Sequence, residues 1–380
     1  MIKVLFFLPT LGSGGAERVL VNLVNNIAPT RFDVTVKTLF DIGSNRALLS
    51  PKVKYEACMT RVPKGIMHLM KFASRKFLHR LFIKKAYDLE ISYLEGMSTR
   101  IISGCDNPRT KLIAWVHTEF VDKKFAAYAY RNFAEAARCY ERYDKVVCVS
   151  EEVRRRFGEL FYSSSKKAVV NYNTNDAELI RTLAKSPVEE NLFSGEEFKI
   201  IAVGKINANK GFDRLARALK RLFSEGLRPH FYVVGKGEER GKLEEFLTKE
   251  ALNANFTFLG FHKNPYRFVK RCDLFICSSY REGFSTAVTE ALILGVPVLT
   301  VDVSGMRELL GERNEYGVVV PNDEESLYLG IKEFLTNPML SLKYKKLAEE
   351  RGRSFSKDVT VAETEKLLKE VVGKGEEEGC

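Results

Sequence analysis

Residues 273–301 read DLFICSSYREGFSTAVTEALILGVPVLTV, and this stretch predicts the fold of the chain. Its first five residues are mostly apolar and indicate a short buried strand. A polar loop follows, and Ser285 stands where a helix N-cap is expected, before an apolar helical run that ends at Gly295. A second apolar strand comes directly afterwards. Strand, loop, helix and strand form the unit from which parallel sheets are built.

The same alternation runs along the whole chain. In the first half we expect strands at residues 4–8, 34–38, 89–92, 112–116, 145–149 and 168–170. In the second half we expect strands at residues 199–203, 230–234, 256–259, 274–277, 297–301 and 317–320.

Few strand formers occur in residues 183–197, which we interpret as a linker between two domains. The predicted fold is therefore α/β, with two doubly wound, Rossmann-like domains at residues 1–182 and 198–355. Residues 356–380 are expected to form a C-terminal helix, at about 359–372, and a frayed tail. We expect this segment to cross back to the first domain.

Composition is that of a globular protein with two domains. Of the 380 residues, 45% are hydrophobic and 29% are charged. No run of about 18 apolar residues occurs, and the apolar start lacks the basic region of a signal peptide. The seven cysteines are scattered without a C-x-x-C pair, and the five histidines have no metal-ligand spacing. We therefore expect neither disulfides nor a metal site, and a cytoplasmic location.

Charge is unevenly distributed along the chain, whose net charge is +11. Residues 1–186 hold 31 Lys and Arg against 18 Asp and Glu, whereas the remainder holds 29 against 31. Residues 61–87 contain no acid, and apolar residues recur there with helical spacing. A core helix with a solvated basic face would explain the spacing but not the absence of acids. We therefore predict a basic amphipathic helix at residues 64–85 that binds an anionic membrane surface, and no nucleic acid.

Three loops that follow predicted strands are candidates for phosphate binding. Residues 11–18 (LGSGGAER) open a helix, but they lack the G-x-G-x-x-G spacing, so a structural turn is an equal alternative. Residues 204–212 (GKINANKGF) carry Lys205 and Lys210 with no acid to neutralise them locally, which favours a diphosphate contact. Residues 235–239 (GKGEE) form a flexible turn, and the alternative role of Glu238 is that of a first-turn carboxylate stabilised by the helix dipole.

Two carboxylates eight residues apart, Glu282 and Glu290, are the most informative pair. A carboxylate only accepts hydrogen bonds, so each suits two adjacent hydroxyls of a sugar or a ribose. The N–H groups at the helix start would meet a negative leaving group between them. The alternative is a plain amphipathic helix with one acid at its start and one on its exposed face.

This E-x7-E spacing resembles the signature of retaining GT-B glycosyltransferases, closest to family 4 of the group 1 transferases. Further agreement, spread over about residues 1–340, occurs at residues 14–18, 149–152, 173–176, 210–211, 235–239 and 295–298. The resemblance implies two domains that face each other across a cleft. It is more specific in the C-terminal half.

The resemblance also implies roles for single residues. Glu282 would bind hydroxyls of the transferred sugar, Glu290 the ribose and Lys210 the diphosphate. His117 stands where such enzymes carry a histidine near the reacting sugar, although a structural histidine is as common after a strand. Lys205 departs from the family, which usually has Arg there, and lysine lacks the bidentate fork of arginine.

The predicted catalytic residues are Glu282, His117 and Lys210. The predicted donor-binding residues are Gly14, Gly15, Lys205, Lys210, Glu238, Phe261 (against the base), Gly283, Phe284, Ser285, Thr286 and Glu290.

We therefore expect a retaining, metal-independent hexosyl- or N-acetylhexosaminyltransferase without a cofactor. It would use a nucleotide-sugar, expected to be a UDP-sugar, and a glycan or lipid-linked acceptor of cell-surface polysaccharide synthesis, at the inner face of the membrane. One alternative is a nucleotide-sugar epimerase on the same scaffold, which would work without an acceptor. Another is a non-catalytic membrane-surface binding module, which would bind no nucleotide.

Overall fold

The computed structural model describes residues 1–373, which divide into two compact units. The first unit combines residues 1–174 with the chain from Lys357 onward, and the second unit spans Asn175–Ser356. Helix α8 (Ala177–Ala184) therefore belongs to the second unit, although we placed the end of the first domain at residue 182. The reason is packing, since Ala177, Ile180 and Ala184 are buried in the core of the second unit.

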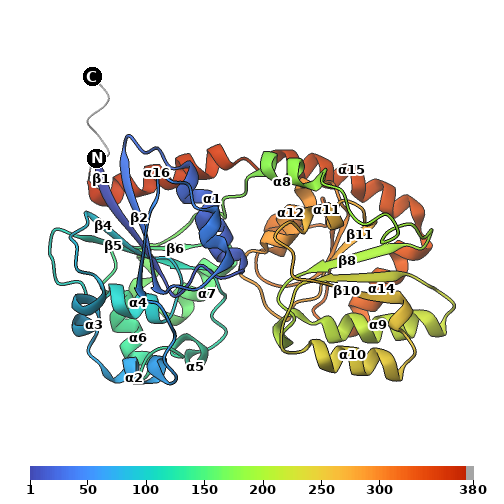
Figure 1. The fold of residues 1–380 in the computed structure, drawn as a ribbon, viewed down its shortest axis with the longest axis horizontal. Helices are drawn as coiled ribbons and strands as arrows, with labels where there is room; N and C mark the ends of the chain where they lie inside the picture. Colours follow the sequence, from blue (N-terminus) through green and yellow to red (C-terminus); the bar gives the residue numbers. More distant parts are fainter. Residues whose placement is uncertain (374–380) are drawn as a thin grey trace. The chain divides into compact units, whose positions relative to one another are not determined.

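The first unit contains a seven-stranded parallel sheet with the order β3-β2-β1-β4-β5-β6-β7 (Figure 1). Its strands are β1 (Ile2–Leu8), β2 (Phe32–Phe40), β3 (Lys54–Met59), β4 (Leu89–Ser92), β5 (Lys111–Val116), β6 (Lys145–Cys148) and β7 (Ala168–Val170). All six predicted strands are confirmed, and β3 is additional. Its sequence, KYEACM, carries two charges and lies at the sheet edge, partly exposed, so no continuous apolar run marked it.

The second unit contains a six-stranded parallel sheet with the order β10-β9-β8-β11-β12-β13. Its strands are β8 (Lys199–Val203), β9 (His230–Val234), β10 (Phe256–Gly260), β11 (Leu274–Cys277), β12 (Val298–Val301) and β13 (Val318–Val320). All six were predicted. They are nearly continuous apolar runs, as expected of strands that are buried on both faces.

Helices cover both faces of each sheet (Figure 1). In the first unit they are α1 (Gly15–Asn26), α2 (Ile66–Phe72), α3 (Arg75–Phe82), α4 (Met97–Ile102), α5 (Lys123–Ala126), α6 (Phe133–Tyr140), α7 (Glu151–Leu160) and α16 (Lys357–Val372). In the second unit, α8 is followed by α9 (Phe212–Ser224), α10 (Arg240–Lys249), α11 (Tyr266–Val269), α12 (Thr286–Ile293), α13 (Met306–Leu310), α14 (Glu324–Thr336) and α15 (Pro338–Ser354). Short 3-10 helices are η1 (Ser44–Leu48), η2 (Tyr162–Lys167), η3 (Ala208–Lys210) and η4 (Asn253–Asn255).

The C-terminal helix α16 packs in the first unit. Its Glu365 carboxylate accepts a hydrogen bond of 2.7 Å from the backbone N–H of Ala28, which follows α1. Residues 374–380 of the predicted tail lie outside the described residues. Within residues 1–373, no helix combines the length and the apolar character needed to cross a bilayer.

The basic segment at residues 64–85 is not one helix, as we predicted, but two. Helix α2 ends before Ala73, and Ser74 then caps α3 by accepting a hydrogen bond from the N–H of Phe77. Arg100 of α4 stabilises the break, because its guanidinium donates to the carbonyl oxygens of Met70, Lys71 and Ala73. In a continuous helix these carbonyls would instead accept hydrogen bonds from N–H groups four residues further along the chain.

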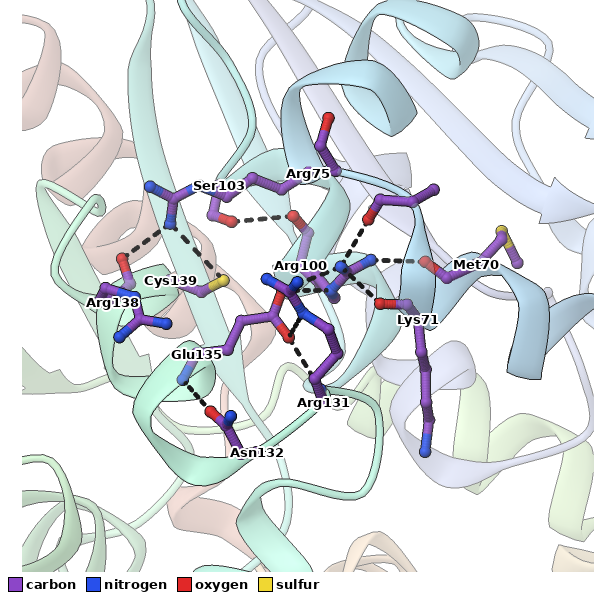
Figure 2. Close-up of polar contacts among 12 residues, drawn as sticks. Met70, Lys71, Arg75, Arg100, Ser103, Arg131, Asn132, Glu135, Arg138 and Cys139 are labelled. Carbon is purple, nitrogen blue, oxygen red and sulfur yellow. Dashed lines mark hydrogen bonds and ion pairs between the residues drawn. The ribbon is translucent and has the colours of Figure 1, made fainter.

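Figure 2 shows how Arg100 is held. Its side chain is fully buried, and Nη2 lies 2.9 Å from Oε1 of Glu135. The other carboxylate oxygen of Glu135 accepts from Arg131. A buried guanidinium is tolerable only when its donors are satisfied, and here one carboxylate and three carbonyls satisfy it. The end of α2 is thus tied to α4 by hydrogen bonds from a buried guanidinium whose charge Glu135 balances.

A second buried pair anchors α3. Nε2 of His79 lies 2.7 Å from Oε2 of Glu90, a buried acid on the central strand β4. Burial opposes protonation of His79, but hydrogen bonds to Cys105 and Glu90 and the Glu90 charge outweigh it and raise the pKa of the imidazole to about 9. The imidazolium therefore neutralises the buried carboxylate at neutral pH.

Candidate functional site

The predicted donor residues of the second unit come from loops at one edge of its sheet. Because the strands are parallel, the loops that follow β8, β9, β10 and β11 all leave from their carboxyl ends. These loops carry Lys205 and Lys210, Glu238, Phe261, and Glu282, respectively. The topology thus gathers residues that are up to 77 positions apart in the sequence.

The centre of this edge is an ion pair between Lys210 and Glu282. Nζ of Lys210 lies 2.5 Å from Oε1 of Glu282, and the two side chains are 27% and 13% exposed. The hydroxyl of Ser279 donates to the same oxygen at 2.6 Å. Burial alone would lower the pKa of Lys210, but the Glu282 carboxylate more than offsets it and the pKa is raised. The lysine is therefore charged, and its position is fixed by the acid.

Backbone contacts hold the two loops against each other. The carbonyl of Lys210 accepts a hydrogen bond of 2.9 Å from the hydroxyl of Ser278, and the N–H of Tyr280 donates to the carbonyl of Asn209 at 2.8 Å. Gly211 makes this approach possible, because its φ is +64° and a Cβ atom there would lie 2.0 Å from the carbonyl oxygen of Ser278. Any side chain at this position would push Lys210 away from Glu282.

Helix α12 begins next to this pair. Ser285 is its N-cap, as predicted, and its hydroxyl accepts from the N–H of Val288. The residues from Gly283 to Thr286 form the turn into the helix, whose first N–H groups have no partner within the helix. A helix start of this kind favours negative charge.

Glu290 lies one turn further along α12 and is partly buried. Its Oε1 accepts a hydrogen bond of 3.0 Å from the hydroxyl of Tyr266, a buried residue of α11. The carboxylate is therefore oriented by a neighbouring helix, and the picture of an acid on a plain exposed helix face is wrong.

From the loop sequence we expected no acid to neutralise Lys205, and this expectation is wrong. Its Nζ lies 3.7 Å from Oε2 of Glu238 in the next loop, and both side chains are mostly exposed. Lys210 is likewise paired, with Glu282. Both acids are more than 30 residues away in the sequence, so inspection of the loop alone could not identify them. An exposed pair such as Lys205–Glu238 contributes little stability and can open for a ligand.

Phe261 follows β10 with 40% of its surface exposed. The ammonium of Lys236 lies 5.4 Å from the centre of its ring, within the range of a cation–π contact. An exposed ring at this edge offers a flat apolar surface, as the predicted contact with a base requires.

In the first unit, Gly14 and Gly15 stand at the start of α1, after β1. Gly14 is the N-cap and makes no side-chain hydrogen bond. The carboxylate of Glu17 folds back over the loop, so that a Cβ atom on Gly14 would lie 2.3 Å from its Oε2. Burial, partly offset by a backbone hydrogen bond, raises the pKa of Glu17.

His117 lies at the carboxyl end of β5, beside Tyr93 and Glu95, which follow β4. Its ring centre is 4.7 Å from that of Tyr93, and its backbone N–H donates to Oε2 of Glu95 at 3.0 Å. Burial lowers the pKa of His117 to about 3, so the imidazole is neutral. Within residues 1–373, its buried Nε2 has no hydrogen-bond partner, nor has the hydroxyl of Tyr93.

Several residues at these edges were not predicted. Ser279 and Cys277 contact Glu282, Tyr266 holds Glu290, and Glu95 lies beside His117. Burial raises the pKa of Glu95, although hydrogen bonds from Thr118 and His117 oppose the shift. The sequence offered a signal for Ser279 and Glu95, since both are polar residues within three positions of the end of a strand. No sequence signal marked Tyr266, because its contact with Glu290 arises only when α11 packs against α12.

One group among residues 1–373 brings three metal-ligand atoms within 4.8 Å, namely His79, Glu90 and Cys105. These side chains already satisfy one another through the His79–Glu90 pair and a 3.9 Å contact from Sγ of Cys105 to Oε1 of Glu90. They belong to the anchor of α3 rather than to the candidate sites.

Two family models match the chain. Residues 187–352 match the glycosyl transferases group 1, and residues 13–179 match glycosyltransferase family 4. A Campylobacter jejuni protein named N-acetylgalactosamine-N,N'-diacetylbacillosaminyl-diphospho-undecaprenol 4-alpha-N-acetylgalactosaminyltransferase is 27% identical, over 94% of this chain and 96% of its own. An uncharacterized glycosyltransferase of Haemophilus influenzae is 24% identical, over 98% and 99% of the two chains.

Solved structures share the fold. Anabaena Alr3699/HepE, crystallised with UDP, aligns with a TM-score of 0.77 at 19% identity, over 97% of this chain and all of that one. WaaG, a glycosyltransferase involved in lipopolysaccharide biosynthesis, aligns with a TM-score of 0.73 at 17% identity, over 96% and 99%. The predicted GT-B fold is confirmed.

A double-mutant cycle tests the coupling of the central pair. Either single change, Lys210→Met or Glu282→Gln, leaves one partly buried partner without its counterpart, whereas the double variant removes both. We expect a coupling free energy of about 1 to 2 kcal/mol in chemical denaturation at pH 7. If the two single losses add to the double loss within about 0.5 kcal/mol, the pair does not hold the two loops together.

Proposed function

The chain belongs to the glycosyltransferases of group 1 and family 4, and on this premise we propose that it transfers a hexosyl or N-acetylhexosaminyl group from a UDP-sugar to a glycan on a lipid carrier, with retention of anomeric configuration. The observation that carries the proposal is the partly buried Glu282 carboxylate, fixed by Lys210 and Ser279 beside the start of α12. Two similar proteins support the proposed acceptor and donor. The name of the Campylobacter protein specifies α-transfer to a glycosyl diphospho-undecaprenol, and HepE was crystallised with UDP-glucose.

In the proposed donor complex, Glu282 accepts hydrogen bonds from sugar hydroxyls and Glu290 from the ribose. One oxygen of Glu282 is occupied by Lys210 and Ser279, and the other remains available for a hydroxyl. Lys210 uses one of three N–H donors on Glu282, so its other two can bind the diphosphate. The lysine thus links the carboxylate that orients the sugar to the phosphates that leave.

We propose that the leaving group assists its own displacement. The bond between the anomeric carbon and the β-phosphate oxygen breaks, and the acceptor oxygen bonds to that carbon from the same face. The acceptor proton passes to the departing phosphate oxygen. Lys210, Lys205 and the first N–H groups of α12 stabilise the negative charge of that phosphate, so the reaction as proposed needs no metal ion.

The first unit carries polar groups of its own that suit a sugar or a phosphate. The unpartnered Nε2 of His117 is neutral and can exchange one hydrogen bond with a sugar hydroxyl. The N–H groups that follow Gly14 at the start of α1 suit a phosphate oxygen. An epimerase on this scaffold would use the same nucleotide-sugar, but it would give product without any acceptor.

Replacement of Glu282 by alanine tests the proposed activity. We expect kcat with a lipid-linked acceptor to fall at least about 100-fold, because the lost contacts orient the sugar in the transition state. The Kd of UDP, measured by calorimetry, should change far less. The matched control is Glu245→Ala, an exposed acid of α10 outside the loops of the site. Equal turnover of the wild type and Glu282→Ala would contradict the assignment.

We also propose that the segment of α2 and α3 rests on an anionic membrane at the inner face, where a lipid-linked acceptor lies. Its Leu69, Phe72 and Phe77 are 65%, 68% and 57% exposed. Two of its basic residues are neutralised, Arg80 by Asp106 and Lys85 by Glu56. Lys64, Lys71, Lys76 and Lys84 form no ion pair within residues 1–373, and each would gain about 1 kcal/mol near an anionic surface.

Vesicle flotation measures this binding. We expect the wild type to float with vesicles that contain anionic lipid and to remain unbound with neutral vesicles. Lys64→Glu with Lys76→Glu should weaken binding at least about tenfold, at about 1 kcal/mol per lost lysine contact. Lys345→Glu with Lys346→Glu, on α15, makes the same change of net charge and should bind normally. Equal weakening by both pairs would contradict a surface specific to α2 and α3.

A further inference from the structure

A hollow lies in the second unit, at the far end of α12 from Ser285. It has a volume of about 620 Å³, within the size range of small-molecule pockets. Its walls come from α8, from the end of α11, from the end of α12 and from the last turns of α15. The proposed donor site lies at the carboxyl ends of the strands, whereas Gly295 of the hollow precedes β12 at its amino end.

The rim of this hollow is strongly basic. Five cationic side chains line it, namely Arg181, Lys185, Lys270, Arg271 and Arg353. None of the five forms an ion pair with any acid in residues 1–373, and neither does Glu349, the one acid of the lining. The lysines of the proposed donor site differ in this respect, since both have carboxylate partners.

Helix capping accounts for some of these cations. Arg181 donates to the carbonyl of Gly352 at 2.9 Å, and Lys270 donates to the carbonyl of Leu294 at 2.7 Å. Cations at helix C-termini are ordinary, because they satisfy terminal carbonyl groups. Within residues 1–373, Lys185 and Arg353 donate to no helix carbonyl, so helix capping does not account for these two cations.

The floor of the hollow is apolar. Ala184, Ile293 and Leu294 are buried residues of the core that form it. Glu349 reaches over Gly295, where a Cβ atom would lie 2.4 Å from its Cγ. The hollow therefore offers cations for phosphate groups, one carboxylate for hydroxyls and an apolar surface for a ring or a hydrocarbon group.

We propose that this hollow binds an organic diphosphate, separately from the sugar donor. The phosphate groups contact Lys185 and Arg353, the hydroxyls contact Glu349, and the apolar part covers Leu294. A nucleotide and a prenyl diphosphate share this chemistry. The ligand would connect α8 to α15, the first and last helices of the second unit, through one further set of contacts beside the Arg181–Gly352 bond.

Calorimetric titration of the full chain tests the site, with ADP and geranyl diphosphate as separate probes. We expect at least one probe to bind. Lys185→Glu with Arg353→Glu should weaken that probe at least about tenfold, which corresponds to about 1.4 kcal/mol. The control, Lys345→Glu with Lys346→Glu, carries the same net charge on the same unit and should leave its affinity within about twofold, below about 0.5 kcal/mol. Lys185→Gln with Arg353→Gln gives a milder second variant.

The outcome with each probe is decisive. Binding of ADP alone identifies a nucleotide site, and binding of geranyl diphosphate alone identifies a lipid-derived ligand. Either result supports the proposal if Lys210→Met leaves the affinity unchanged, because that variant alters only the proposed donor site. Loss of the probe in Lys210→Met, equal weakening by the control pair, or binding of neither probe to the wild type would overturn it. None of these readouts depends on sugar transfer.

Discussion

The ion pair of Lys210 and Glu282 is the interaction on which the proposed site depends. It joins the loop after β8 to the loop after β11, two neighbouring strands at the centre of the second sheet. Burial of either charge alone would be unfavourable, so each residue keeps the other in place. Gly211 and Ser278 bring the backbones close enough for the pair to form. The carboxylate proposed to orient the sugar and the ammonium proposed to bind the leaving phosphate are therefore positioned by one contact.

The same principle holds the basic segment of the first unit. Arg100 is fully buried with Glu135 and three carbonyl groups, and His79 is buried with Glu90. These two pairs fix α2 and α3 while Phe72 and Phe77 remain exposed. These exposed aromatic residues belong to the surface that we propose to rest on the membrane. In both units, buried charge thus maintains the geometry of a surface that is proposed to bind a ligand.

Sequence patterns predicted the two sheets because parallel strands are short apolar runs that lie between helices, as at residues 274–277. They failed for β3, whose charges belong to a sheet edge, and for the break at Ala73, which Arg100 from a distant helix stabilises. The predicted residues of the second unit do lie along one sheet edge, since every βα loop of a parallel sheet leaves from the same side. The pairing of Lys205 with Glu238, and of Tyr266 with Glu290, could not be predicted, because it arises only when separate loops and helices pack together.

The central claim is that Lys210 and Glu282 form part of a nucleotide-sugar site, and unfolding measured with a panel of nucleoside diphosphates tests it most directly. At a hundredfold excess over its Kd, UDP should raise the free energy of unfolding by about 2.7 kcal/mol. Lys210→Met should abolish this stabilisation, and Lys345→Met, an exposed lysine of α15, should retain it. The account would be contradicted if no nucleoside diphosphate stabilised the protein, or if UDP stabilised Lys210→Met as strongly as the wild type.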